Sequence, residues 1–592
     1  MAILTENPLD AYPCGRRHNG WHAATMAFLV MMSVFLAFRA ANEDRWSDWG
    51  FGDAQTMLSL RHWQENGWLK NYLLFTPQGY AKVIDVLEEP ELRHHAHGIA
   101  PGTSPRVGPR LRYTHYPAGY LLPYAAMFKA GLDTLPAVRM LSLLLSIGAL
   151  AVMYRVFALI SSPRVAFVAV LFYGLSPAFL GYADSLANQP IDDLLRFAFM
   201  LAVVRASQVA DSTVRRRWLA AAWLMAFTLS LTSFDSVFFL YVWLVGWDWI
   251  AGRGVRWRNY LLFAAAPVLA HGLQLVQNAW YLGWAGAIAD ITDVFLYKNG
   301  ADQAFNAGAG RLEVIMSSLG IVFNGVLTPG WLLLLPALLY TGFYRYLRSE
   351  AQEGGYPGMR VLIVLFFAGL AYVVVLPQAA GMPYEARQMV PVVSLLIGGF
   401  AWSIPTVSGW IWRAAGTGRD LLSRRLLAGS YLAASLVAAL YMGAIFFSAS
   451  RLPMHDLKKN GIEMEFARQL TLLPTRYEPV YFDLGGFLSY WDLNYVPGYP
   501  QIFPMTEYYA GGRPILCFQD PVKLADDLKV MLRKGRAVFS PVLVALDPTQ
   551  IERAVAILRR DGILIDTPGD ALTNMGRYAL DLTSVIRWDN GK

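Results

Sequence analysis

The sequence contains few charged residues for its length. Of its 592 residues only 16% are Asp, Glu, Lys or Arg, while 55% are hydrophobic and 14% are aromatic. A soluble protein of several domains needs a larger charged fraction to cover its surface. The composition therefore excludes an ordinary soluble protein and predicts a polytopic membrane protein, whose main solvent is the lipid bilayer.

The sequence also predicts neither a disulfide bond nor a nucleic-acid-binding module. The two cysteines, Cys14 and Cys517, fall on opposite sides of the membrane in the topology given below, so they cannot pair. The net charge is +7, but the basic residues are scattered through connecting loops. Nucleic-acid-binding proteins instead gather such residues into a patch. We expect no structural disulfide and no nucleic-acid partner.

Hydrophobic runs long enough to cross a bilayer recur through the first 450 residues. We expect eleven spans, within residues 21–38, 136–159, 165–183, 189–209, 218–247 (two spans), 259–289, 314–344, 361–376, 388–412 and 426–450. Arginine concentrates in alternate connections, which the positive-inside rule assigns to the cytoplasm. We therefore expect an integral protein of a bacterial inner membrane, with a cytoplasmic N-terminus and an outer C-terminus.

Two long loops and a terminal domain are expected on the outer side. The loops cover residues 41–116 and 290–313, and the apolar but Pro-broken segment 113–131 should lie at the interface because it is too short to span. From residue 451 strand-like and helix-like segments alternate, which predicts a soluble α/β domain over 451–592. Residues 1–450 then form the transmembrane catalytic domain.

The first outer loop opens on an acidic stretch, residues 42–67, NEDRWSDWGFGDAQTMLSLRHWQENG. From Asp53 onward its pattern predicts a short amphipathic helix lying on the bilayer. A carboxylate at the start of that helix faces the positive end of the helix dipole, which suits a general base. The alternative, equally open, is that Asp48 and Asp53 are ordinary helix N-caps.

Ionisable residues gather at the predicted outer boundary of the membrane. They are Asp44, Asp48, Asp53, Asp184, Asp192, Asp193, Arg196, Lys298, Arg311 and Arg387, with His115 among them. Transporters more often place such residues at mid-membrane. A set at one boundary suits a reaction between a lipid-borne substrate and a second substrate from outside.

A phosphate on that lipid would give the basic residues a role. Arg387 and Lys298 could neutralise it, and a phosphate leaving group needs no proton at neutral pH, so one base is enough. In the alternative interpretation, Arg196 only pairs with Asp192 one turn away, and Lys298 and Arg311 extend to the interface. For Arg196 we favour that alternative.

The order of these segments resembles the GT-C superfamily of integral-membrane glycosyltransferases, which includes the protein mannosyltransferase and lipid A aminoarabinose transferase families. GDAQTMLSLRHWQENG is similar to the acidic motif and helix of the family's first outer loop, and THYPAGYLL to its His-Pro-Pro segment. SPAFLGYADSLANQPIDDLL is similar to its second outer loop with a further Asp. YKNGADQAFNAGAGR is similar to its later His-Asn and Arg element, and YEARQMVPVVSLLIGG to its Arg-Tyr plus Pro signature at the start of a late span. The match covers residues 20–410 and departs from the family at Tyr116 and Gln388, where Pro and Tyr are usual.

The resemblance implies transfer of a sugar from a polyprenyl-phosphate donor to an envelope glycan, lipid or protein. By it Asp53 corresponds to the catalytic carboxylate, Asp192 to the second-loop acid and Arg387 to the late arginine. We predict Asp53 and Asp48 as catalytic residues. The predicted substrate-binding residues are Asp44, His115, Asp192, Lys298, Arg311 and Arg387.

No cofactor is required by the sequence. The histidines at 94, 95 and 97 lie on an irregular loop, where we expect no metal, and a divalent cation near Asp44 and Asp48 is left open. The segment YWDLN only echoes the WWDYG signature of oligosaccharyltransferases, which disfavours block transfer of a glycan to Asn. A flippase for a lipid-linked substrate, or a non-catalytic assembly protein, are the competing functions.

Overall fold

The structure is a computed structural model of the whole chain. It describes residues 19–42, 46–47, 50–76, 112–300, 310–327, 336–342, 358–380, 387–415, 426, 429–437, 440, 465–475, 477–485, 504–518, 520–535, 539–565, 571–574, 577–581 and 586–588. The chain divides into two compact units. The first unit comprises Met1–Asn42, Arg139–Gly272 and Leu296–Leu452, and the second comprises Glu43–Val138, Leu273–Phe295 and Pro453–Lys592.

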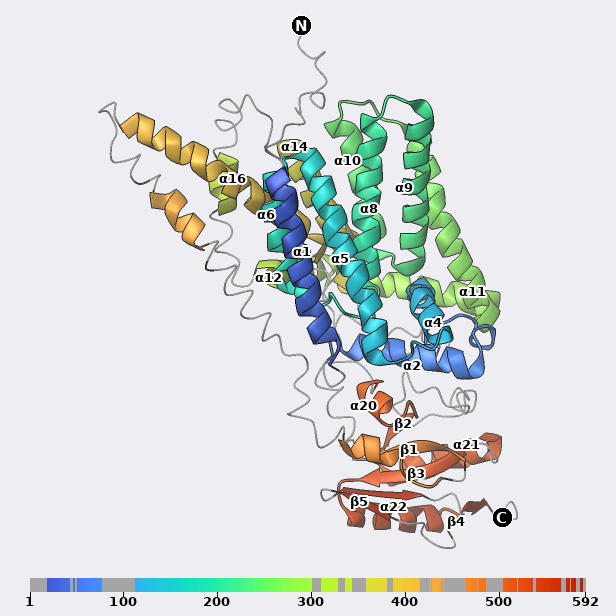
Figure 1. Ribbon diagram of the computed structural model, residues 1–592. Coiled ribbons are helices and arrows are strands. Elements are labelled where there is room, and N and C mark those ends of the chain that lie inside the picture. The colour runs from blue at the N-terminus through green and yellow to red at the C-terminus, as the bar shows by residue number, and fades with distance from the viewer. Residues whose placement is uncertain are drawn as a thin grey trace. The chain divides into compact units, whose positions relative to one another are not determined.

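The first unit is helical (Figure 1). Its helices are α1 (Asn19–Ala40), α5 (Leu135–Ile160), α6 (Pro163–Gly174), α7 (Pro177–Leu180), α8 (Gln189–Gln208), α9 (Ser212–Thr232), α10 (Asp235–Ile250), α12 (Arg311–Leu327), α14 (Met359–Val375), α15 (Pro377–Ala380), α16 (Val390–Ala415) and the ends of α11 (Trp257–Lys298). Helix α8 packs against α9, α6 against α16 and α10 against α14 around one apolar core.

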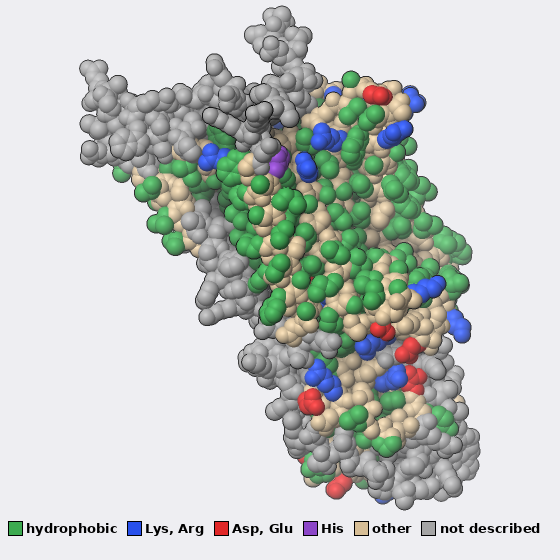
Figure 2. All heavy atoms as spheres, viewed as in Figure 1, with side chains coloured by type: hydrophobic (Ala, Val, Ile, Leu, Met, Phe, Trp, Pro, Cys, Tyr) green, Lys and Arg blue, Asp and Glu red, His purple; other side chains and the backbone are tan. Residues whose placement is uncertain are grey.

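Several helices have the length and composition to cross a membrane. In the part of the chain that the structure describes, three helices of at least 18 residues are also apolar enough to cross a bilayer, namely Gly20–Ala40, Leu135–Ile160 and Trp257–Leu296. Shorter apolar helices cover Pro163–Gly174, Met359–Val375 and Val390–Ile404. Large apolar side chains such as Val34, Leu144 and Leu269 are exposed, and Figure 2 shows hydrophobic side chains over much of the helical surface. Such a surface is stable in lipid, so the protein is an integral membrane protein.

Two predicted spans differ from the observed helices. The span predicted over 165–183 is interrupted, because α6 ends at Gly174 and α7 starts at Pro177, where the Ser176 hydroxyl accepts from the Phe179 amide at 3.3 Å. The helix that contains the predicted seventh span, α11, continues to Lys298 and consists of two helical segments. At Gly283 its backbone has φ 73° and ψ 162°, which joins two helical segments. Residues 290–298, predicted as loop, are therefore helical.

The second unit joins the first outer loop to the C-terminal segment. Its loop part contains α2 (Gly50–Asn66), η2 (Leu69–Asn71), η3 (Ala118–Tyr120) and α4 (Leu121–Lys129). Helix α2 packs against α4 and against α20 (Pro504–Tyr509). The nine residues of α4 are too few to span, as the sequence predicts.

Helix α2 is not the half-exposed amphipathic helix that the sequence predicts. Most of its side chains are buried, including the polar residues Ser59 and His62. The Ser59 hydroxyl donates to the Thr76 carbonyl at 2.7 Å, and the His62 ring bonds to Asn71. The chain after α2 folds back over its polar face, because these buried groups need partners.

The C-terminal part has the alternating strands and helices that the sequence predicts. Its elements are β1 (Glu478–Leu484), α20, β2 (Ile515–Phe518), α21 (Pro521–Gly535), β3 (Phe539–Ala545), α22 (Pro548–Arg560), β4 (Ile563–Ile565), β5 (Ala571–Asn574), β6 (Arg577–Asp581) and β7 (Ile586–Trp588). A five-stranded sheet has the order β2-β1-β3-β6-β5, with β1 parallel to β2 and β3. Strands β6 and β5 are antiparallel, and β4 pairs with β7 separately.

Candidate functional site

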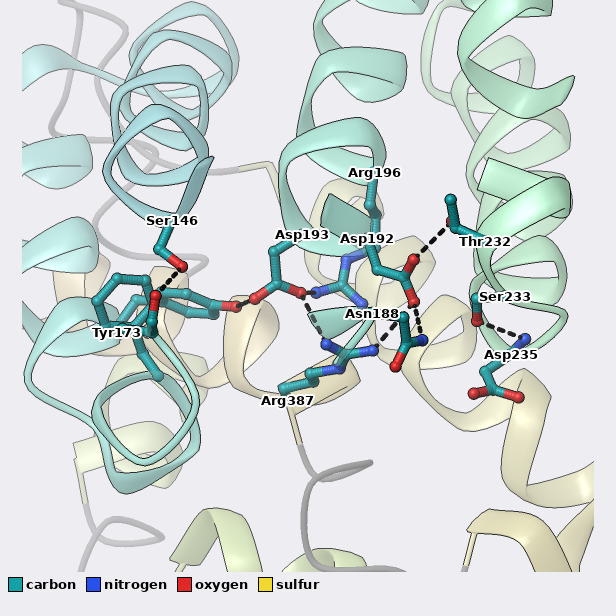
Figure 3. Close-up of polar contacts among 12 residues, drawn as sticks. Ser146, Tyr173, Asn188, Asp192, Asp193, Arg196, Thr232, Ser233, Asp235 and Arg387 are labelled. Carbon is teal, nitrogen blue, oxygen red and sulfur yellow. Dashed lines mark hydrogen bonds and ion pairs between the residues drawn. The ribbon is translucent and has the colours of Figure 1, made fainter. Parts of the chain in front are cut away.

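Four buried charges surround the start of α8 (Figure 3). The Arg387 guanidinium donates from Nη2 to Asp192 Oδ2 at 3.2 Å, and its Nη1 lies 3.9 Å from Asp193 Oδ1. Arg196 pairs with Asp193 from the next turn of the helix. The two carboxylates and the two guanidinium groups are paired with one another, as buried charges in an apolar environment need to be.

Neutral donors complete this cluster. Thr232 Oγ1 donates to Asp192 Oδ1 at 2.8 Å and Asn188 Nδ2 donates to Asp192 Oδ2 at 2.6 Å. The Tyr173 hydroxyl donates to Asp193 Oδ2 at 2.8 Å. All four carboxylate oxygens therefore have a donor, so both side chains are held in fixed orientations.

The partner of Arg196 differs from the one we favoured. The sequence interpretation pairs Arg196 with Asp192, but the structure pairs it with Asp193, three residues earlier on the same face of α8. Asp192 instead pairs with Arg387, which is 195 residues away in sequence. The choice of partner follows from tertiary packing, which spacing along one helix does not report.

A second buried cluster was only partly predicted. Asp184 lies between α7 and α8 and pairs with Arg39 at the end of α1 and Arg139 near the start of α5. Arg139 also donates to the Asn42 carbonyl at 3.3 Å. Burial would raise the pKa of the Asp184 carboxyl, but the two guanidinium groups beside it hold that pKa below its ordinary value.

Arg39 and Arg139 were not predicted as members of this cluster. Arg139 falls inside the predicted span 136–159, close to its start. The available signal was that an arginine in the first turns of an apolar helix requires an anionic partner. Asp184, predicted at the outer boundary, was the candidate.

Asp53 is fully buried in the first turn of α2. Its Oδ2 accepts a hydrogen bond from the Ser47 amide at 3.2 Å. Across from α2, Tyr120 is hydrogen-bonded to Thr56, and burial raises the pKa of Tyr120, with a smaller contribution in the same direction from the Asp53 charge. Asp53 therefore does not face bulk solvent, and it lies beside a hydroxyl that stays protonated.

His115 makes a buried contact with α11. Its Nε2 lies 2.8 Å from Asp290 Oδ1, and Thr114 Oγ1 donates to Asp290 Oδ2 at 2.6 Å. The side chains of Gln274 and Asn278 donate to the Thr114 carbonyl at 3.3 and 3.0 Å. These contacts fasten residues 114–115 to the helix.

The remaining predicted residues lie in separate surroundings. The Lys298 ammonium is 4.3 Å from the centre of the Phe234 ring, next to the segment in which Thr232 contacts Asp192. Arg311 is exposed and donates to the Val374 carbonyl at 3.2 Å, at the end of α14. Asp44 and Asp48 lie outside the described residues, as do the histidines at 94, 95 and 97.

A cavity of about 300 Å³ lies between α2 and α4. Its lining comprises Leu60, Trp63, Gln64, Gly67, Trp68, Ala125, Phe128 and Lys129. Asp53 does not line this cavity. Within the described ranges, no group of three or more His, Cys, Asp or Glu side chains is placed to hold a metal ion.

Comparison with known proteins identifies the fold. No protein-family model matches the chain, and no curated protein matches it. ArnT from Cupriavidus metallidurans, crystallised with undecaprenyl phosphate, matches with a TM-score of 0.52 and 12% identity, over 95% of this chain and 98% of that one. This match shows that the chain shares its fold with ArnT, in agreement with the fold that its resemblance to the GT-C superfamily predicts.

Other solved structures match less well. The Archaeoglobus fulgidus oligosaccharyltransferase in its apo form has a TM-score of 0.44 at 12% identity, over 91% of this chain and 73% of that one. The arabinofuranosyltransferase AftD from Mycobacteria has a TM-score of 0.43 at 14% identity, over 97% and 42%.

Proposed function

We propose that the protein is a membrane glycosyltransferase of the GT-C type, which moves a sugar from a polyprenyl-phosphate donor to an acceptor on the outer side. The observation that supports this most is the buried, hydrogen-bonded Asp53 at the start of α2, in a chain with the fold of ArnT. The ArnT structure has undecaprenyl phosphate bound, and this lipid belongs to the class of leaving group that the proposed reaction releases.

The reaction needs one base and a stabilised leaving group. Asp53 takes the proton of an acceptor hydroxyl while that oxygen attacks the anomeric carbon. The bond from that carbon to the phosphate oxygen breaks, and polyprenyl phosphate leaves with the electron pair. Arg387 and Lys298 stabilise its charge, and Asp192 orients Arg387 through their ion pair.

The other predicted residues also have proposed roles. Asp48 assists Asp53, and Asp44 binds substrate, both from the acidic stretch. For His115 the contact with Asp290 supports a role in fixing the loop. For Arg311 the bond to the Val374 carbonyl supports a role at the end of α14.

The test is sugar transfer in proteoliposomes from a panel of radiolabelled polyprenyl-phosphate sugars. Asp53→Asn is expected to lower kcat by about 10² to 10⁴ because general-base catalysis is lost, while donor binding is retained. Asp547→Asn is the control, since Asp547 is the N-cap of α22 and Asn caps equally well. Full activity of Asp53→Asn would remove Asp53 from the mechanism.

A flippase for a lipid-linked substrate is the second candidate. Transporters place substrate sites at interrupted helices, and the described part of this chain contains such interruptions, including those between α6 and α7 and at Gly283. Movement of a fluorescent polyprenyl-phosphate lipid across the bilayer of the same proteoliposomes, without any sugar transfer, would favour the flippase over the transferase.

A further inference from the structure

The C-terminal part of the chain contacts the acidic stretch through an aromatic cluster. Trp46 is fully buried, and its indole N–H donates to the Tyr509 hydroxyl at 2.8 Å. The Trp46 ring meets those of Tyr508 and Tyr509 edge-on, with centroids 5.1 and 6.1 Å away. The Arg61 guanidinium, from α2, lies 4.6 Å from the centre of the Tyr508 ring. Edge-on aromatic pairs and a cation on a ring face each add to this contact.

The peptide that follows Trp46 is the one that binds Asp53. The Ser47 amide, which donates to Asp53 Oδ2 at 3.2 Å, belongs to the peptide unit joining Trp46 to Ser47. The planar peptide unit starts at the Cα atom of Trp46, so fixing the Trp46 side chain anchors one end of that unit and limits where the N–H can lie. The position of Trp46 therefore influences how the Asp53 carboxylate is held.

The other end of the contact is anchored in the sheet. Glu507 is fully buried in α20 and accepts from the amide of Ile515, the first residue of β2, at 3.0 Å. The Glu507 carbonyl accepts from the Gly512 amide at 2.7 Å. Arg468 lies 4.7 Å from the centre of the Tyr509 ring. Helix α20 is thus tied to the central sheet and is not a free surface turn.

We propose that the C-terminal domain positions the base of the reaction, with Tyr509 holding Trp46 and the Ser47 amide thereby orienting the Asp53 carboxylate. The proposal rests on the function proposed above, in which Asp53 is the base. It makes Tyr509 and Trp46 positioning residues, which act on Asp53 through hydrogen bonds and do not touch substrate. A domain distant in sequence then contributes to turnover by fixing one carboxylate.

Two substitutions remove the same hydrogen bond from opposite sides. Tyr509→Phe removes the acceptor hydroxyl and Trp46→Phe removes the donor N–H, while both keep aromatic rings in place. Each is expected to lower kcat by about 10- to 100-fold, because small displacements of a catalytic group are costly, with the donor KM unchanged. The double variant should be no slower than either single one, since both act on one interaction.

A second readout does not depend on activity. Hydrogen exchange of the Ser47 amide, measured by mass spectrometry on the full-length protein, should accelerate in Tyr509→Phe and in Trp46→Phe. Tyr578→Phe is the matched control, because it removes a hydroxyl from the same domain, on β6 and away from α2. It should change neither exchange at Ser47 nor kcat.

The outcomes separate this proposal from the proposed function. An unchanged Ser47 exchange rate, or a normal kcat in Tyr509→Phe while Asp53→Asn is inactive, overturns the positioning role alone. Additive losses, with raised KM and a lowered melting temperature, indicate a merely structural contact and also overturn it. Full activity in Asp53→Asn overturns the role of Asp53, and with it the catalytic part of this proposal.

Discussion

At the scale of single residues, ionised side chains in this protein are bound to one another inside the helical unit. Asp184 is fully buried with two guanidinium groups around it, and Asp192 with one. Removing one of these side chains leaves a buried charge without a partner. The resulting loss in the free energy of unfolding is far larger than the stability that the intact ion pairs contribute. These residues are therefore sensitive positions whatever reaction the protein performs.

Asp184→Asn is expected to reduce stability in a pH-dependent way. At pH 7 the loss is about 3–5 kcal/mol, because two buried guanidinium groups lose their carboxylate. The pKa of Asp184 is lowered in the folded protein. Its contribution is therefore fully present above the unfolded pKa of about 3.9 and is lost as the pH falls through the lower folded pKa.

Thermal unfolding in detergent between pH 3 and 7 measures this effect. The difference in melting temperature between wild type and Asp184→Asn should shrink below about pH 4. Asp133→Asn is the control, since Asp133 is exposed and no ion pair of it is found among the described residues. A difference that stays constant with pH would contradict the assignment.

At the scale of elements, local sequence predicted most helices and missed where they bend. The observed α5, α8 and α9 fall close to predicted spans because apolar runs bounded by charges report helix ends directly. The break before Pro177 and the extension of α11 to Lys298 were missed. Hydropathy averages over the break before Pro177, whereas Asp290 and Asp293 end the uncharged run of the predicted seventh span without ending the helix.

Gly283 gives a test at this scale. Its φ of 73° with ψ of 162° is a conformation open essentially only to glycine, although a Cβ there would meet nothing within 4 Å. Gly283→Ala should therefore cost about 1–3 kcal/mol through backbone strain. Gly272→Ala, in the same helix with equal space and an ordinary backbone, should instead stabilise the protein by about 0.5–1 kcal/mol.

Melting temperatures of the two variants make the comparison. The sign of the effect should differ between Gly283→Ala and Gly272→Ala, because only the first position needs a backbone that other residues avoid. Equal and small effects would mean that the two segments of α11 are joined without strain.

At the scale of the whole molecule, composition predicted the membrane class, and segment order predicted the fold that the chain shares with ArnT. Candidate residues were predicted less well. Arg387 and Asp192 were selected separately and prove to be partners, whereas Arg39 and Arg139 were missed. Pairing between distant helices depends on three-dimensional packing, and a single sequence contains no direct record of it.

The membrane topology can be tested with two introduced cysteines, in a background without Cys14 and Cys517. Thr549→Cys, exposed in the first turn of α22, should react with a membrane-impermeant maleimide in intact cells, because the C-terminal domain is predicted outside. Ser212→Cys, exposed at the start of α9, should react only after lysis. The opposite labelling pattern would show that the protein has the opposite orientation in the membrane.

The pairing of Asp192 with Arg387 also has a consequence for biosynthesis. The two residues are 195 positions apart, so a ribosome adding about 5–20 residues per second makes the arginine roughly 10–40 s after the aspartate. During that interval α8 has emerged with an acid whose counter-charge does not yet exist. A nascent chain stalled before residue 387 should therefore hold α8 outside the lipid, or depend on an insertase to shelter it.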